Sequence, residues 1–393
     1  MSSISERLSL GFSCIGHLYS HLFAPVFYVA ALTLEGDLSL THGRVVTLVV
    51  AGNLLFGVAA PLAGWLGDRW SSTGMMGLFF IGAGLGMVMT GFSSSPFQIA
   101  MWLTFTGLFA SIYHPVGIAF LIRNSVNRGF MLGVNGVFGG VGPGIAALSA
   151  GMLIEFFDWR AAFIVPGAVI LLTGAAFYVL LARGIIVESK IDRRQDPPKS
   201  RQEMVRVFLV LTVTMLCTGV IYQATQPAMP KLFLERMGDL ADGGVLAAST
   251  LVAVVYLFAG VMQVAAGIMA DRYRLKVIYI LTFVLQAPLL FFAAGLSGTA
   301  LVVVTLVMVT INVGSLPAEN SLLARYAPGK WRGLAFGMKF ILAFGVSSIG
   351  VMMEGALYDM TGGFNRLFEA LAAIAVVGIA AGLLLPDERE TPA

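Results

Sequence analysis

The chain has 393 residues, of which 58% are hydrophobic and 11% charged, and its formal net charge is +3. A soluble domain usually carries about 25% charged residues, so these few charges cannot cover a water-facing surface of this size. The composition excludes a soluble globular enzyme, a disordered chain and a nucleic-acid binder, and it indicates that lipid is the main solvent.

Twelve apolar stretches, each long enough to cross roughly 30 Å of bilayer hydrocarbon as a helix, follow one another along the chain. Helices are expected because lipid offers no other partner to backbone polar groups. The first stretch runs on through Pro25 without a cleavage site, so we interpret it as a span and not as a signal peptide. The predicted spans are 8–34, 44–66, 75–92, 97–122, 130–154, 161–183, 206–234, 245–269, 277–296, 299–325, 334–357 and 364–385.

Lysine and arginine fall mainly on one side of these spans, which predicts that both termini are cytoplasmic. The one long polar connection, residues 184–205, is interpreted as a cytoplasmic linker between two six-helix bundles, 1–183 and 206–393. Cys14 and Cys217 lie in apolar stretches and indicate neither a disulfide framework nor a metal cluster. With the N-terminus inside, the outer side holds five of the 24 basic residues: Arg44, Arg160, Lys231, Arg236 and Arg366.

The two halves of the chain repeat each other. Residues 57–70 match 260–273 at an offset of 203, and further matches lie at almost the same offset. Parallel repeats of six helices predict two bundles with a binding site between them near the middle of the membrane. The matched pairs include Gly64/Gly267, Asp68/Asp271, Arg69/Arg272, Pro115/Pro317, Arg123/Arg325 and Pro25/Pro227.

Three of the four histidines are predicted to lie inside the membrane. His17 and His21 are four residues apart, so a helix places them on one face, while His114 lies in the fourth span. Histidine titrates near neutral pH, which suits proton uptake and release. Two alternatives stay open: inert histidines that bond a neighbouring helix, and a Zn or Fe site, which would lack a carboxylate ligand.

Glu319 and Lys339 are the most costly residues to place in lipid, at about 2.5–3.5 kcal/mol each. Their distances from Arg325 and Arg332 along the chain give matching depths on adjacent helices. We expect the two to pair or to face one cavity, either as a static ion pair that fixes packing or as a group that exchanges a proton or an anion.

Neutral polar residues are the remaining candidates for binding. Gln223 aligns with His21 in the repeat, so it is expected to face the same cavity. Tyr28 is expected to continue the face of His17 and His21, and Asn135 is a polar residue within the fifth span that needs a partner.

The loops after the second and eighth spans, Gly64–Asp68–Arg69 and Gly267–Asp271–Arg272, resemble the signature loop of the major facilitator superfamily. The first copy departs from the family pattern because it lacks the basic tail. Within that superfamily, GHLYSHLFAP (16–25) and SIYHPVG (111–117) are similar to the fosmidomycin-resistance-like group. The resemblance implies twelve helices in the superfamily's fold, secondary active transport, and a cavity lined by the first, fourth, seventh and tenth spans.

The resemblance also implies a gating role for the signature loops. Asp68 is expected to face the start of the eleventh span near Gly333, and Asp271 the start of the fifth near Gly129. A carboxylate at a helix N-terminus is stabilised by the helix dipole. The expected latch consists of Asp68, Arg69, Arg123, Asp271, Arg272 and Arg325.

Gly142-Pro143-Gly144 in the fifth span resembles a stretch associated with antiporters, which favours export. The sequence therefore predicts a monomeric transporter of a bacterial inner membrane, in which a proton gradient drives export of a small amphipathic or anionic compound. No cofactor, resident metal, nucleic-acid partner or enzymatic activity is expected. The alternatives are proton-coupled uptake of a small organic acid, metal-ion transport, and a membrane sensor that does not transport.

Overall fold

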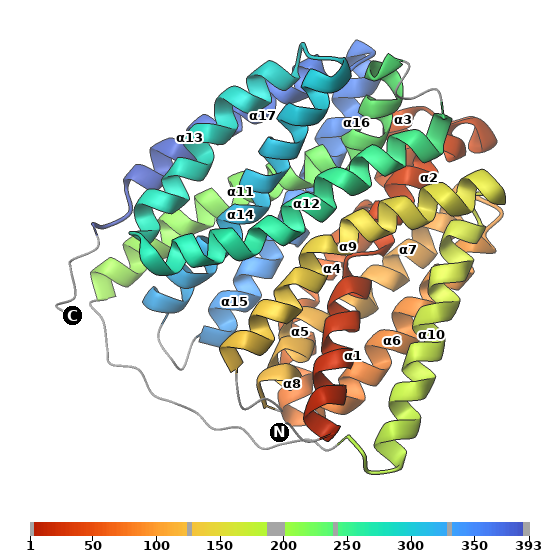
Figure 1. Cartoon of the computed structure of the whole chain (residues 1–393), viewed down its shortest axis with the longest axis vertical. Coiled ribbons are helices and arrows are strands. Elements are labelled where there is room, and N and C mark those ends of the chain that lie inside the picture. Colours follow the sequence, from red (N-terminus) through yellow and green to blue (C-terminus); the bar gives the residue numbers. More distant parts are fainter. Residues whose placement is uncertain (1–3, 124–127, 187–200, 239–242, 328–331, 388–393) are drawn as a thin grey trace.

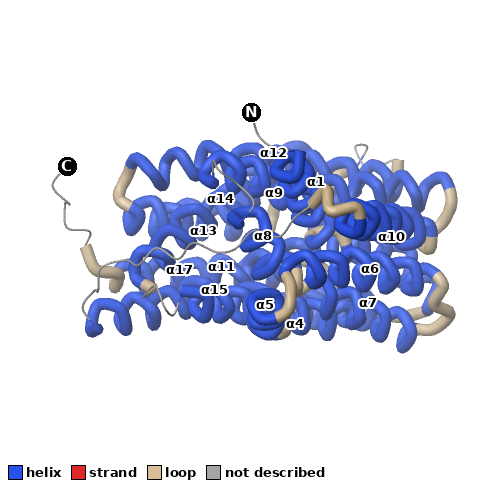
Figure 2. The backbone as a smooth tube through the Cα atoms, turned by 90° about the horizontal axis from the view of Figure 1, so that it is seen from below, coloured by secondary structure: helices blue, strands red, loops and turns tan. Residues whose placement is uncertain are grey.

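The computed structural model describes residues 4–123, 128–186, 201–238, 243–327 and 332–387. Within these ranges the chain is helical apart from short connections, and the helices pack side by side in layers (Figures 1 and 2). Loops 70–71 and 273–274, the start of the first helix and the end of the last helix define what we call the terminal end of the bundle. Loops 39–41, 92–95, 294–297 and 362–364 define the far end.

The first half contains ten α-helices and two short irregular helical segments in its described residues. They are α1 (Ile4–Ser20), α2 (Phe23–Leu38), α3 (His42–Val46), η1 (Thr47–Val49), α4 (Val50–Val58), α5 (Ala60–Arg69), α6 (Ser72–Gly91), α7 (Pro96–Ala110), η2 (Tyr113–Gly117), α8 (Ile118–Arg123), α9 (Arg128–Phe156) and α10 (Ala161–Ala182). The second half contains α11 (Arg201–Arg236), α12 (Gly244–Arg272), α13 (Leu275–Ala293), α14 (Gly298–Tyr326), α15 (Arg332–Phe340), η5 (Ile341–Gly345), η6 (Val346–Ser348), α16 (Ile349–Thr361) and α17 (Asn365–Leu383).

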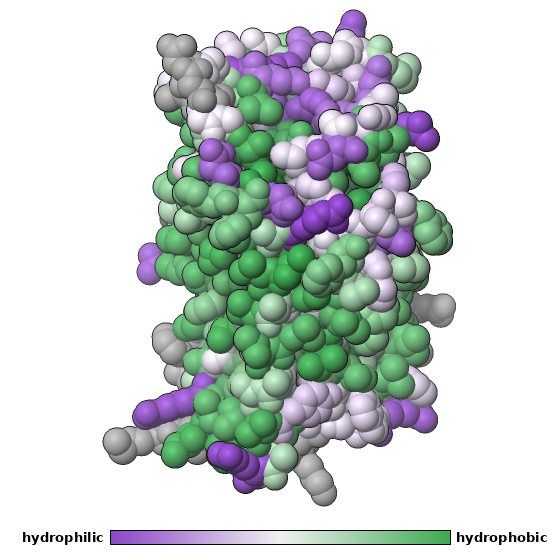
Figure 3. All heavy atoms as spheres, turned by 90° about the vertical axis from the view of Figure 1, so that its right-hand side faces the viewer, coloured by the Kyte–Doolittle hydropathy of each residue, from purple (hydrophilic) through white to green (hydrophobic). Residues whose placement is uncertain are grey.

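These elements form twelve membrane spans. Eleven helices are long and apolar enough to cross a bilayer. The remaining span, the second along the chain, consists of two helical pieces, His42–Val58 and Ala60–Arg69, with a bend of 42° between them. Large apolar side chains such as Leu172, Phe291 and Val303 are exposed on the outside of the bundle. Figure 3 shows an apolar middle between two more polar ends, as a lipid-facing surface requires. The predicted all-helical, twelve-span fold is confirmed.

The first span is interrupted, although the sequence predicts a continuous helix over 8–34. α1 ends at Ser20, and the backbone N–H groups of His21 and Leu22 bond three residues back instead of four. Pro25 explains the break, because a proline ring clashes with the carbonyl group four residues earlier, here that of His21. His21 therefore lies at the break, in the interior of the protein, where irregular backbone is tolerated.

Two further spans contain a π-helical turn, which the sequence does not predict: η2 in the fourth span and η5 in the eleventh. Pro115 lies within η2 and removes a backbone donor there. Such turns often mark functional sites inside helices.

The halves meet at two close helix crossings that the internal repeat relates. A Cβ atom on Gly57 of α4 would lie 2.3 Å from the backbone N of Gly345 in η5. A Cβ on Gly260 of α12 would lie 2.5 Å from the carbonyl carbon of Gly140 in α9. Since Gly57 and Gly260 occupy equivalent positions in the repeat, glycine permits close backbone approach at both crossings.

Candidate functional site

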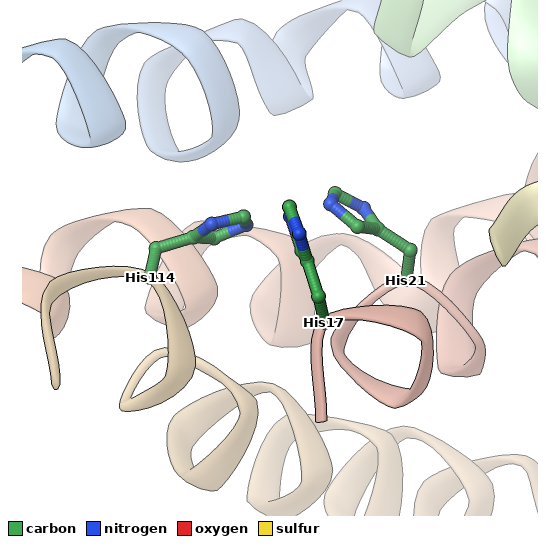
Figure 4. A group of neighbouring side chains, drawn as sticks. All are labelled: His17, His21 and His114. Atoms are coloured by element: carbon green, nitrogen blue, oxygen red, sulfur yellow. The ribbon is translucent and has the colours of Figure 1, made fainter. Parts of the chain in front are cut away.

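Three histidines from two spans meet in the interior of the first half, at its boundary with the second. The ring centroids lie 5.4 Å (His17–His21), 5.3 Å (His17–His114) and 5.1 Å (His21–His114) apart. One ring nitrogen from each lies within 4.8 Å of the other two. Figure 4 shows the three rings turned toward a common space. The structure thus brings together the three histidines singled out in the sequence, and we call them the histidine cluster.

The orientation of His17 is held by a polar network behind it. Its Nδ1 lies 2.8 Å from the backbone carbonyl oxygen of Asn135, so Nδ1–H donates there and Nε2 is left facing the cluster. The Asn135 amide donates to the Tyr113 hydroxyl at 2.8 Å, and that hydroxyl donates to the Ser13 carbonyl at 2.6 Å. The His17 ring also stacks on Tyr113, with centroids 5.0 Å apart. Asn135 is therefore part of this site, as a residue that positions His17.

A missing side chain on α9 makes room for the cluster. A Cβ atom at Gly139 would lie 2.3 Å from the His17 ring, too close for any side chain without a shift of that ring. Gly136, one turn earlier on the same helix, has no such neighbour within 4 Å. The glycine-rich part of the fifth span thus accommodates an imidazole.

Two aromatic rings from the second half cover the cluster. Phe340 and Phe344 stack on His114, with centroids 4.9 and 5.8 Å away and rings within 16° of parallel. Phe344 belongs to the π turn η5, and its carbonyl oxygen accepts a 3.4 Å hydrogen bond from Gln223. Since Phe344 also lies 6.2 Å from the His21 ring, His21 and Gln223 border the same residue. The cluster therefore lies at the interface of the two halves.

Glu319 of α14 and Lys339 of α15 form a buried ion pair, with Nζ 2.8 Å from Oε1. The predicted contact between them is confirmed. The Tyr279 hydroxyl donates to the other carboxylate oxygen at 2.6 Å, and Lys339 donates to the Asn320 side chain at 2.5 Å. Glu319 is 1% exposed and Lys339 5%. Lys339 directly precedes Phe340, so this pair borders the aromatic cover of the histidine cluster.

Tyr28 does not continue the histidine face in the way the sequence predicts, because the helix breaks between them. Its hydroxyl accepts a 2.9 Å hydrogen bond from Asn53, and its ring meets the ring of Phe27, with centroids 6.1 Å apart. Tyr28 is fully buried against the second span.

The residues expected to form the latch lie at the terminal end. Asp68, Arg69, Asp271, Arg272 and Arg325 are exposed there. The Arg69 guanidinium lies 5.0 Å above the Trp65 ring, and α5 packs against α15, the start of the eleventh span. The Arg123 side chain and the surroundings of Gly129 and Gly333 lie outside the described part of the structure, so the expected latch stays a prediction.

The fourth histidine, His42, was not singled out from the sequence, yet it lies in a buried charged network at the far end. Its ring contacts Glu35 and Glu354, and Lys231 binds Glu35. The sequence contained a sign of this network. Lys231 and Glu354 fall inside the predicted spans 206–234 and 334–357, where a charged side chain is costly.

Two relatives match this chain over nearly its whole length. It is 22% identical over 382 residues to an uncharacterised MFS-type transporter of Bacillus subtilis, covering 95% of this chain and 92% of the relative. It is 23% identical over 421 residues to a probable sulfoacetate transporter of Cupriavidus necator, covering 98% and 96%. A riboflavin transporter of Clostridioides difficile is 24% identical over 39% of this chain and 34% of its own length.

A solved structure has the same fold. It is a bacterial homologue of the human lysosomal transporter Spinster in an inward-facing, occupied conformation, with a TM-score of 0.75, 13% identity, and coverage of 98% of this chain and 95% of that one. A family model described as Major Facilitator Superfamily matches residues 13–311 and 241–393. With twelve spans in two repeated halves and a polar site where they meet, the chain belongs to the major facilitator superfamily of membrane transporters.

Proposed function

We propose that this superfamily member is a proton-coupled exporter of a small anionic or amphipathic compound, working by alternating access. The observation that carries the proposal is the convergence of His17, His21 and His114 at the boundary between the halves. A site at that boundary is exposed to opposite sides of the membrane in turn when the halves rock against each other.

The chemistry of the cluster suits an exchange of protons for an anion. Imidazole changes its charge near neutral pH. Protons on the three rings and an anion among them stabilise each other, because each reduces the Coulomb cost of the other in a site of low dielectric. Departure of the protons then weakens the hold on the anion, which couples the two movements.

The Glu319–Lys339 pair supports the same function. It lies on the second half, next to Phe340, which covers His114. The ion pair and the covering ring of Phe340 move together when the second half moves. A substrate anion that competes with Glu319 for Lys339 would therefore link the charge on the second half to the histidine cluster of the first half. Asn135 positions His17 through its backbone carbonyl oxygen, and Gln223 donates to the carbonyl oxygen of Phe344, which borders the cluster.

The proposal includes an orientation. The distribution of lysine and arginine assigns the terminal end to the cytoplasm and the far end to the outside of a bacterial inner membrane. Residues 1–183 and 206–393 act as the two moving bodies of a monomer. The loops with Asp68–Arg69 and Asp271–Arg272 act with Arg123 and Arg325 as the cytoplasmic latch.

Export is favoured over uptake by two features of the sequence. Gly142-Pro143-Gly144 resembles an antiporter stretch, and the two segments similar to fosmidomycin-resistance-like transporters carry all three histidines of the cluster. The opposite direction, uptake of a small organic acid, is favoured by the similarity to a probable sulfoacetate transporter. Both directions use the same site.

Transport in proteoliposomes tests the proposal. Vesicles loaded with a pH-sensitive dye are given sulfoacetate or riboflavin under an imposed pH gradient, after a ligand-stabilisation screen at two pH values. Antiport predicts that acid on the far-end side accelerates movement of sulfoacetate or riboflavin toward that side. Symport predicts that it accelerates movement of the compound away from that side. His114→Gln should abolish the coupled proton flux, and Glu369→Gln, which alters a half-exposed carboxylate paired with Arg366 on α17, should not. Absence of ligand-driven proton flux in the wild type would favour a sensor, and a flux that survives both His114→Gln and His17→Gln would remove the histidine cluster from the coupling.

Transport of a divalent metal ion is the second candidate, because one ligand nitrogen from each histidine lies within 4.8 Å of the others. The bond from His17 Nδ1–H to a backbone carbonyl is the outer contact usual for a metal-binding histidine. Co²⁺ titration of the purified protein decides between the candidates. A tetrahedral absorption band that disappears in His114→Gln supports the metal, and its absence in the wild type excludes it.

A further inference from the structure

A second buried ionic site joins the two halves at the far end. The two ring nitrogens of His42 each lie 2.7 Å from a carboxylate oxygen, Nδ1 from Glu35 and Nε2 from Glu354. Lys231 binds the other oxygen of Glu35. Glu35 and His42 belong to the first half, whereas Lys231 and Glu354 belong to the second. We call these four residues the far-end cluster.

Two aromatic rings and several charged groups surround His42. The Tyr358 ring contacts the His42 ring edge to face, with centroids 4.7 Å apart, and lies 4.6 Å below the Lys231 ammonium group, and its hydroxyl donates to Glu235. Phe364 closes the remaining side at 6.1 Å. The titratable or charged groups that face the site from the elements packed around it are Glu35 of α2, Arg44 of α3, Lys231 and Glu235 of α11, and Glu354, Tyr358 and Asp359 of α16.

The two contacts of His42 require one extra proton. A neutral imidazole has one N–H and one bare nitrogen, so it can donate to only one of two carboxylates. The other contact needs a proton on the second ring nitrogen or on Glu354. Glu354 is fully buried, and its Oε2 has no hydrogen-bond partner among the described residues. With the proton, the two carboxylates are balanced by His42 and Lys231; without it, a buried negative charge is left over.

Neighbouring contacts between the two halves also hold the far end closed. The Thr41 hydroxyl and the Gly43 N–H donate to the Asp359 carboxylate at 2.6 and 3.0 Å. A Cβ on Gly43 would lie 2.6 Å from the Gly355 carbonyl oxygen, so the two backbones touch. The partners of His42 are on opposite halves, so separation of the halves at this end must break the His42–Glu354 contact.

We propose that His42 and Glu354 form a proton-binding site whose occupation closes the far end of the transporter. Closure takes up one proton from the far side, and loss of that proton leaves a bare nitrogen against a buried carboxylate, which favours opening. The inference goes beyond the function proposed above, because it holds for any compound that the histidine cluster binds.

The distance between the halves as a function of pH tests this site without a substrate. Ser94 and Ser297 are exposed on equivalent far-end loops of the two halves, and the native Cys14 and Cys217 are buried. Spin labels on Ser94→Cys and Ser297→Cys, in a C14A/C217A background in lipid nanodiscs, report the closed and open populations. We expect the closed-to-open ratio to fall by up to tenfold per pH unit, as release of one proton requires.

Variants of the far-end cluster separate proton binding at His42 and Glu354 from a general effect of pH. The amide of Glu354→Gln donates to His42 without an added proton, so this transporter should stay closed across the range. Lys231→Met removes a cation from the cluster, so its opening should move to higher pH. Glu369→Gln, whose carboxylate pairs with Arg366 on its own helix, should behave like the wild type.

A wild type whose distances do not change between about pH 5 and about pH 9 would overturn the proposal. So would a Glu354→Gln transporter that opens with the same pH dependence as the wild type. If Glu354→Gln is not recovered in a folded form, Lys231→Met provides the test. A Lys231→Met transporter that opens at the same pH as the wild type would count against the proposal. Because no substrate is present, failure here leaves the transport proposal to its own assay.

Discussion

Replacing Lys339 with methionine probes the buried pair on the second half. The pair is 2.8 Å long and almost inaccessible to solvent. At an effective dielectric constant of about 20, its gross Coulomb energy is about 6 kcal/mol. Part of that energy is offset by desolvation, and loss of one partner of a buried pair typically costs about 3–5 kcal/mol. We expect Lys339→Met to lower the free energy of unfolding by that amount, since among the described residues Glu319 keeps only the Tyr279 hydroxyl as a donor.

Denaturant titration of the purified protein in mixed micelles measures this loss. The double variant Glu319→Gln/Lys339→Met should recover most of it, because it leaves no unpaired charge. Lys276→Met is the matched control: Lys276 pairs with Asp387 over the same 2.8 Å, but the Asp387 side chain is 92% exposed. Its hydrogen bond and charge lower the pKa of Asp387, yet loss of this pair should leave unfolding unchanged, because water replaces it.

Two results would contradict this prediction: a Lys339→Met protein that unfolds like the wild type, or a double variant that is no more stable than Lys339→Met alone. Either result would mean that water or another cation reaches Glu319. In the transport assay, Glu319→Gln then separates the two roles considered for the pair. Unchanged coupling of proton flux to transport makes the pair structural, whereas lost coupling with normal folding places Glu319 in the cycle.

Three further predictions follow from single contacts. Gly139→Ala should weaken binding of a stabilising ligand at least tenfold, or about 1.4 kcal/mol, because its Cβ displaces the His17 ring; Gly136→Ala should bind normally, and equal binding by both variants would contradict this. Gly43→Ala should raise the open population in the spin-label experiment, whereas Gly36→Ala, with no neighbour within 4 Å, should not; closed Gly43→Ala protein would count against it. Tyr113→Phe should lower unfolding free energy by about 1–3 kcal/mol, since Asn135 and Ser13 lose a buried partner; thermal unfolding that matches the wild type would rule this out.

The spans could be predicted because membrane insertion is a local property. A run of about 20 apolar residues must become a helix wherever it lies in the chain, since lipid cannot bond its backbone. The same reasoning singled out His17, His21, His114, Glu319 and Lys339, because a polar side chain inside such a run is costly without a purpose or a partner. The matching depths of Glu319 and Lys339 predicted that the two would pair or face one cavity, and the structure shows the pair.

The irregularities at the site were harder to predict. Pro25 and Pro115 indicate that a helix hydrogen bond is lost, but a proline can kink a helix, break it or cause a π turn. Pro227, the repeat partner of Pro25, lies within the continuous helix α11. Neighbouring helices choose among these outcomes, so the break at His21 needed the packed structure.

The order of residues is enough to identify the solvent, the number of spans, the duplication and the polar residues that the membrane interior contains. Which of those residues meet depends on how the helices pack. His42 and Glu354 are 312 positions apart and belong to different halves, and no hydropathy pattern relates them. Partition into lipid depends on each segment alone, whereas an ionic contact between two bundles depends on how their surfaces fit.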